Sequence, residues 1–215
     1  FLIINTPWNL KPGGHSVPRF KNLPFSKILV EIFSVVFAVL LALWVNEWRS
    51  VLEHRDLAGT ALEHLLAEVR HNQAEINESL EGHRKMLDTL NFYIRGLENA
   101  DESRINVLSD RFTYSYSHSV LNNTAWQTAS ITQAVRYMPY AQTEALSSIY
   151  ELQSIYQEHG NGIFRNLGSV SFYDATFPTV IKSAHFNVAL SLNIEEKLDS
   201  SYTVFLRNYA GDAGP

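Results

Sequence analysis

The chain contains 215 residues, of which 46% are hydrophobic and 18% are charged. The charged share lies below the roughly 25% of an ordinary soluble domain, and this deficit indicates a membrane segment or large buried contacts. Seventeen Lys and Arg against twenty-two Asp and Glu offer no basic surface for nucleic acid, so we expect no such partner. The absence of cysteine excludes disulfides, zinc ribbons, thiolate nucleophiles and cysteine-ligated clusters.

The first element is a segment rich in proline and glycine, residues 1–27, for which we predict a mobile arm. Its prolines are too dense for a regular helix or a central strand. Its aromatic residues are unusual for a linker and favour contact with a membrane surface or a partner; they are Phe1, Trp8, Phe20 and Phe25.

Residues 28–46 are predicted to form a transmembrane helix. The stretch from Ile28 to Val45 is apolar apart from Glu31 and Ser34, and its length is close to the roughly 20 residues that span a bilayer. One alternative is a buried core helix, but a helix that is apolar on every face would need a far larger domain around it. The other is a cleaved signal peptide, but the preceding segment is too long for a usual leader. We therefore predict an uncleaved anchor.

The charges on either side of the span predict its orientation. Lys and Arg precede it without any acidic residue, whereas the flank beyond it is mainly acidic. The positive-inside rule then places the arm in the cytoplasm and residues 47–215 in the periplasm, for a single-pass protein of a bacterial inner membrane.

Within the span, Ser34, Ala38 and Ala42 recur at intervals of four and form a ridge of small residues. Such ridges let membrane helices approach closely, so we predict a docking face here, although three small residues also arise in a span by chance. Glu31, at the edge of the ridge, either reaches the headgroups near Lys27 or contacts a neighbouring helix. The interface anchors are Trp44 and Trp48.

Beyond the span, apolar residues at helical spacing predict a helix that ends near Glu81, and a second one from Met86 to Leu97. The opposite face of the first helix carries His64, Glu68 and His71, whose spacing would suit a metal. A solvated face explains these residues equally well, and we predict no metal site.

The remainder reads as helices around one extended stretch. From Phe112 to His118 aromatic residues alternate with Thr and Ser, which predicts an extended segment or the edge of a helix rather than a paired strand. Helical patterns follow over residues 123–138 and 139–159, with Pro139 in the first turn of the second helix and the glycine cluster 160–162 closing it. The irregular tail offers one or two further helices.

Two stretches resemble known proteins. KILVEIFSVVFAVLLALWVNEWRSVLEHR, residues 27–55, resembles the opening of a large group of uncharacterised bacterial single-span membrane proteins, in which a Glu near the start of the span and a Leu-Ala-Leu…Asn…Trp ending are typical. LNNTAWQTASITQAVRYMPYAQTEALSSIYELQSIY, residues 121–156, is similar to their later part, with Trp126 and Tyr150 as matching residues that we interpret as core. The resemblance covers about a third of the chain. It implies a mostly helical outer domain and no activity.

The fold class predicted is therefore mainly α, with one N-terminal transmembrane helix and an irregular helical-bundle extramembrane domain. The chain contains no GxSxG, Walker A, GxGxxG or CxxCH motif, so we expect no enzyme, no catalytic residues and no cofactor. The function predicted is a non-catalytic accessory subunit of a larger bacterial membrane complex, respiratory or photosynthetic, with other membrane subunits and lipid as partners. A periplasmic ligand-binding or sensor-like module and an uncharacterised hydrolase remain as alternatives.

Overall fold

The computed structural model describes residues 25–211, and every regular element in this range is helical. The elements are α1 (Phe25–Leu97), α2 (Glu102–Arg111), α3 (Thr124–Ile131), the 3-10 helix η1 (Ala134–Tyr137), α4 (Tyr140–Leu167), α5 (Val170–Tyr173) and α6 (Phe177–Tyr209). The predicted mainly-α class, with a long apolar helix near the N-terminus and a helical domain after it, is confirmed.

The chain divides into two compact units, residues 1–50 and 51–215. The arm predicted for residues 1–27 lies outside the described residues except at its end. Residues 25–27 already belong to α1, because Pro24 is the last proline before it and the chain can enter a helix directly afterwards.

Among the described helices, α1 is the one that is long and apolar enough to cross a membrane, and its apolar part lies in the first unit. None of its most apolar stretch is buried. A core helix of a soluble protein would be covered on most of its surface, so this exposure favours a membrane span over the buried-helix alternative.

The break predicted in α1 after Glu81 is wrong, because the helix continues without interruption to Leu97. Between Leu80 and Met86 the core position of α1 is filled by His83, a side chain with only 2% of its surface exposed. Its Nδ1 lies 2.9 Å from a carboxylate oxygen of Glu195 on α6, so the buried face of α1 continues through a polar residue. A pattern of apolar residues alone could not show this.

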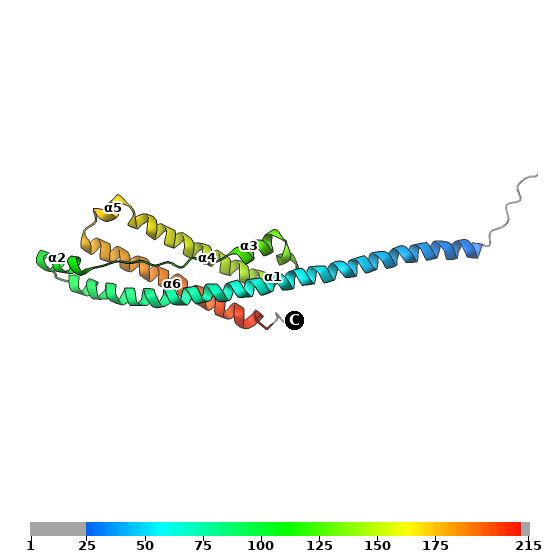
Figure 1. Ribbon diagram of the computed structural model, residues 1–215, viewed down its shortest axis with the longest axis horizontal. Coiled ribbons are helices and arrows are strands. Elements are labelled where there is room, and N and C mark those ends of the chain that lie inside the picture. Colours follow the sequence, from blue (N-terminus) through cyan, green and yellow to red (C-terminus); the bar gives the residue numbers. More distant parts are fainter. Residues whose placement is uncertain (1–24, 212–215) are drawn as a thin grey trace, which may run out of the picture. The chain divides into compact units, whose positions relative to one another are not determined.

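In the second unit, α4 and α6 lie side by side along the part of α1 that follows residue 51 (Figure 1). Gln73 of α1 bonds Asp199 of α6, and His83 bonds Glu195, so these two helices run antiparallel. The core between the three helices includes fully buried side chains from each of them, among them Leu65, Leu66, Val69, Ile76, Leu90, Leu146, Tyr156, Ile181, Leu198, Tyr202 and Phe205.

The segment from Phe112 to His118, where the alternating pattern predicted an extended stretch or a helix edge, is extended and continues so to residue 123; no strand lies among the described residues. The segment runs antiparallel to α1. Tyr93 donates to the carbonyl of Arg111 near its start, while Asn72 bonds both the N–H and the carbonyl of Asn122 near its end. We call residues 112–123 the strap.

Three further expectations need correction. The glycine cluster does not close a helix, since α4 runs through it to Leu167. Pro139 is the N-cap of α4 rather than part of its first turn. The helix predicted over 123–138 ends at Ile131, because Gln133 adopts a left-handed conformation with φ 61° before η1 begins. The tail forms one main helix, α6, with Pro178 in its first turn.

Candidate functional site

The small residues predicted as a docking face all lie exposed on α1. Ser34, Ala38 and Ala42 stand four residues apart, so they follow one side of the helix. Beside them the rings of Phe33 and Phe37 stack along the helix at a centroid distance of 6.3 Å. The result is a narrow row of small side chains flanked by a bulky one.

The other predicted residues of the span are exposed as well. Trp44 is 66% and Trp48 is 59% exposed, one turn apart, as interface anchors would be. Glu31 lines a shallow hollow of about 290 Å³ with four aliphatic neighbours, Ile28, Ile32, Val35 and Val36. A carboxylate in this setting needs a polar partner or water when the helix is in a membrane.

A buried polar cluster, which the sequence did not predict, lies between α1, α4, α6 and the strap. His83 Nδ1 lies 2.9 Å from Oε1 and 3.1 Å from Oε2 of Glu195, which is fully buried. Nε2 of the same ring lies 3.0 Å from the carbonyl oxygen of Ser117 in the strap. Tyr156 of α4 donates its hydroxyl hydrogen to Glu195 Oε1 over 3.0 Å. Three helices and the strap therefore meet at one carboxylate and one imidazole.

The partners of His83 decide how its hydrogens are placed. A carbonyl oxygen only accepts, so Nε2 carries a hydrogen and donates to Ser117. An ionised carboxylate also only accepts, so with Glu195 ionised the ring bonds both partners as an imidazolium. Burial of Tyr156, together with the nearby charge of Glu195, raises the pKa of its phenol, so it remains a donor at neutral pH. Every polar atom of this cluster is satisfied within the core.

His118 of the strap sits next to this cluster without hydrogen bonds of its own. Both of its ring nitrogens are buried and lack a hydrogen-bond partner among the described residues, and its ring stacks on Tyr156 at a centroid distance of 4.1 Å. Burial, reinforced by the histidines at positions 83 and 159, lowers the pKa of His118 to about 4. The ring is therefore neutral near pH 7 and acts as an aromatic packing group.

Gly160 of α4 makes the place of this ring available. A Cβ atom at this position would lie 2.4 Å from Cε1 and Nε2 of His118, closer than any tolerated contact. The glycine that looked like a helix terminator is thus a point of close approach between α4 and the strap.

Glu68 is a second polar residue whose role the sequence did not reveal. It was predicted to lie on a solvated face, yet its Oε2 accepts the backbone N–H of Ala125 over 2.8 Å and its Oε1 accepts the hydroxyl of Tyr150 over 2.6 Å. The carboxylate therefore caps the start of α3 and ties it to α1 and α4. Tyr150 is buried, as predicted, whereas Trp126 is only half-buried and stacks on it at 5.1 Å.

The residues His64, Glu68 and His71 do not come together as metal ligands. Among the residues that the structure describes, no three His, Asp or Glu side chains lie close enough to hold an ion. The two oxygens of Glu68 are already engaged by α3 and α4.

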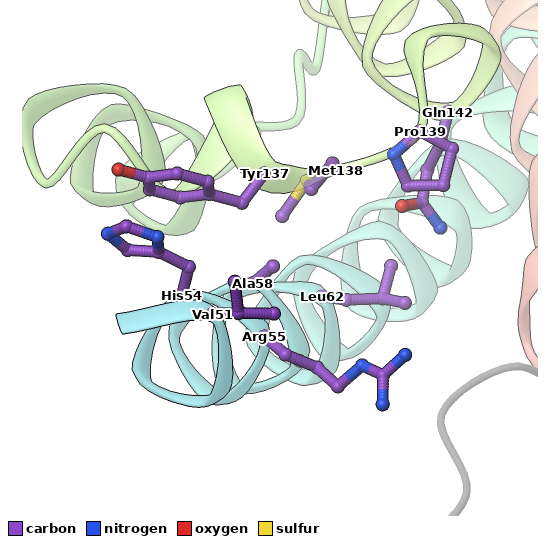
Figure 2. Close-up of a pocket in the computed structure, with 10 residues that line it drawn as sticks. Val51, His54, Arg55, Ala58, Leu62, Tyr137, Met138, Pro139 and Gln142 are labelled. Atoms are coloured by element: carbon purple, nitrogen blue, oxygen red, sulfur yellow. The ribbon is translucent and has the colours of Figure 1, made fainter. Parts of the chain in front are cut away.

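A pocket of about 510 Å³ opens between the first turns of α1 in the second unit and the chain from η1 to α4 (Figure 2). Figure 2 shows His54 stacked face to face with Tyr137, at a centroid distance of 3.9 Å, while Met138 points toward Ala58. We call this the juxtamembrane pocket, because its lining begins at Val51, three residues after Trp48 in the same helix; the lining consists of Val51, His54, Arg55, Ala58, Gly59, Leu62, Tyr137, Met138, Pro139 and Gln142.

Comparison of the chain with protein-family models, with curated proteins and with solved structures gives no match.

Proposed function

We propose that this protein is a non-catalytic accessory subunit of a larger complex in a bacterial inner membrane. In this proposal α1 docks by its row of small residues against a neighbouring membrane helix, and the helical domain stands in the periplasm. The complex in this proposal is a respiratory or photosynthetic assembly.

The observation that carries the proposal is the contrast between the two units. The apolar part of α1 leaves its whole surface free, including Ser34, Ala38 and Ala42. Lipid tails are as apolar as leucine, so specific association of such a helix depends on close packing and polar contacts. This row and Glu31 supply both.

The second unit uses its buried ionisable groups for structure. His83 and Glu195 satisfy each other in the core, and Glu68 caps a helix. Groups whose bonding capacity is consumed in this way are not available to bind or activate a substrate. This supports a structural rather than a catalytic role.

The docking face is tested by enlarging it. Ala38→Leu or Ser34→Leu should release the protein from its complex during purification in mild detergent, while expression and membrane insertion remain intact. Leu40→Phe adds bulk on the opposite side of α1, outside the hollow that Glu31 lines, and serves as the control, which should co-purify with the complex like the wild type. Co-purification of the ridge variants at wild-type stoichiometry would refute the docking face.

The orientation is tested by single cysteines, for which this cysteine-free chain is well suited. Ser154 is exposed on α4, so Ser154→Cys should react with a membrane-impermeant thiol reagent that enters only the periplasm. Ser16→Cys, in the arm, should react only after the cells are opened. The reverse labelling would contradict the orientation.

A periplasmic ligand-binding module is the second candidate, and the pockets of the second unit favour it. Besides the juxtamembrane pocket, a pocket of about 530 Å³ lies between α1 and α3, lined by four threonines together with His64 and Glu68. Volumes of this size suit small molecules. Ala61→Phe fills this pocket. If the protein is a subunit, the variant should still co-purify with the complex at wild-type stoichiometry. If it is a ligand-dependent sensor, the variant should lose its function.

A further inference from the structure

The juxtamembrane pocket combines an apolar floor with a basic rim. Ala58 and Leu62 of α1 face Met138 across it, and both Leu62 and Met138 are buried. At the rim, Arg55 is exposed and extends away from the stacked His54–Tyr137 pair (Figure 2). No ion pair of Arg55 occurs in the part of the chain that the structure describes.

The surface around the pocket is unusually apolar for a domain in water. Tyr140 directly follows the pocket residue Pro139 and is 80% exposed, and Tyr137, which lines the pocket, is 40% exposed. Val51 is 52% exposed at the other lip. Exposed tyrosines and aliphatic side chains gathered near a span are typical of the headgroup region, where Trp and Tyr are enriched.

The chain itself keeps this pocket near the bilayer. α1 is continuous from the span into the pocket, and Val51 is only three positions after Trp48. Three residues reach at most about 11 Å even when fully extended. A lipid headgroup layer is therefore within reach of the pocket's lip.

We propose that the juxtamembrane pocket binds one phospholipid of the membrane that α1 spans. An acyl chain lies against Ala58, Leu62 and Met138, and the lipid phosphate bonds Arg55 at the rim. A guanidinium matches a phosphate in geometry and charge. Because a phosphodiester is common to zwitterionic and anionic lipids, the site does not require the acidic second unit to lie on an anionic surface. This assignment does not depend on the partner proposed above.

Gly59 makes the proposal testable without disturbing the core. It lines the pocket, is exposed, and a Cβ placed on it meets no atom of residues 25–211 within 4 Å. Gly59→Leu therefore fills the pocket with an apolar side chain. Gly82→Leu is the matched control, because Gly82 is also exposed on α1 and equally open, but lies away from the pocket.

The experiment uses the full chain in vesicles of phosphatidylethanolamine and phosphatidylglycerol that contain a phospholipid with a diazirine in its acyl chain. After illumination, labelled peptides are identified by mass spectrometry. We expect label on residues 28–48, from lipid around the span, and on residues 137–142, from the bound lipid. Gly59→Leu should reduce the second label about tenfold or more, equivalent to 1.4 kcal/mol of affinity, and leave the first unchanged, as Gly82→Leu should leave both.

Two further comparisons test whether the lipid phosphate binds Arg55. Arg55→Gln should weaken the 137–142 label, whereas Arg70→Gln, an exposed arginine elsewhere on α1, should not. A diacylglycerol with the same diazirine but no phosphate should label residues 137–142 several-fold less. Absence of that label in the wild type, or its persistence in Gly59→Leu, would overturn the site. Equal labelling by the phosphate-free probe would overturn the role of Arg55.

Discussion

The contact between Gly160 and His118 leads to a sharp prediction, because two glycines of α4 stand two residues apart in opposite surroundings. At Gly162 an added Cβ meets nothing within 4 Å, whereas at Gly160 it would overlap the ring of His118 at 2.4 Å. Gly162→Ala should stabilise the domain and Gly160→Ala should destabilise it, although both replace a helical glycine with the best helix former.

The magnitudes follow from the two environments. An alanine in place of glycine inside a helix gains about 0.5–1 kcal/mol, and Gly162→Ala should show that full gain. In Gly160→Ala the ring must move by more than about 1 Å to reach a normal carbon contact of about 3.5–4 Å. It then loses its stack on Tyr156, about 0.5–1.5 kcal/mol, and strains a packed site at a cost of about 1–3 kcal/mol. We expect a net loss of about 0.5–4 kcal/mol.

The assay is chemical unfolding of the full chain in detergent, followed by circular dichroism. A double-mutant cycle with His118→Ala isolates the contact. With the ring removed, Gly160→Ala should become stabilising by about 0.5–1 kcal/mol, like its neighbour. If Gly160→Ala destabilises the His118→Ala background as strongly as the wild type, the close approach is not the reason that glycine stands there.

Three other predictions concern the polar groups of the second unit. Burial lowers the pKa of His118 from 6.5 to about 4, so the unfolded chain takes up the proton first. The free energy of unfolding should therefore fall as the pH drops from about 6.5 to about 4. In unfolding curves measured across this range, His118→Gln should reduce the dependence of that free energy on pH by up to one proton. Glu195→Ala should lower the free energy of unfolding by about 3–5 kcal/mol, because it leaves a buried imidazole and a phenol unpaired. The neighbouring Glu196 pairs with Arg84 at the surface, so Glu196→Ala should cost under about 1 kcal/mol in the same unfolding assay. Glu68→Gln should cost about 1 kcal/mol through the weakened cap of α3, and an unchanged unfolding midpoint would contradict that cap.

The sequence was sufficient for the elements that depend on apolar periodicity. The span was predicted from an apolar stretch that only Glu31 and Ser34 interrupt. The helix after it was predicted from apolar residues at helical spacing, and the buried ones include Leu62, Leu65, Leu66, Val69 and Ile76. α2 was not predicted, although Asp101, which accepts the N–H of Arg104 over 2.9 Å, is a recognisable N-cap. With no buried residue of its own, α2 has no apolar stripe to reveal it.

The polar contacts could not be predicted in the same way, because each joins residues far apart in the chain. His83 and Glu195 are 112 positions apart, and Glu68 and Tyr150 are 82 positions apart. A single histidine in a helical pattern reads as an interruption, and a single glutamate reads as surface. Only the fold brings them to partners that reverse both interpretations.

The strap gives these buried polar residues a common reason. An extended segment without a neighbouring strand leaves its backbone N–H and carbonyl groups unpaired, and burying them unpaired is costly. Here side chains of the helices take the place of a second strand: Asn72 bonds the N–H and carbonyl of Asn122, His83 the carbonyl of Ser117, and Gln157 the carbonyl of Ser119.

Asn72, Ser79 and His83 stand seven and four residues apart on α1, which is the spacing of a core stripe, and all three are buried. Ser79 also bonds the strap, through the hydroxyl of Ser119. A stripe of polar residues at core spacing therefore indicates that the helix packs against a segment whose backbone N–H and carbonyl groups lack strand partners, rather than against the apolar face of another helix. The polar residues in the core of this domain are therefore explained by the extended strap, because a helix in its place would pair its own backbone groups and could be covered by apolar side chains.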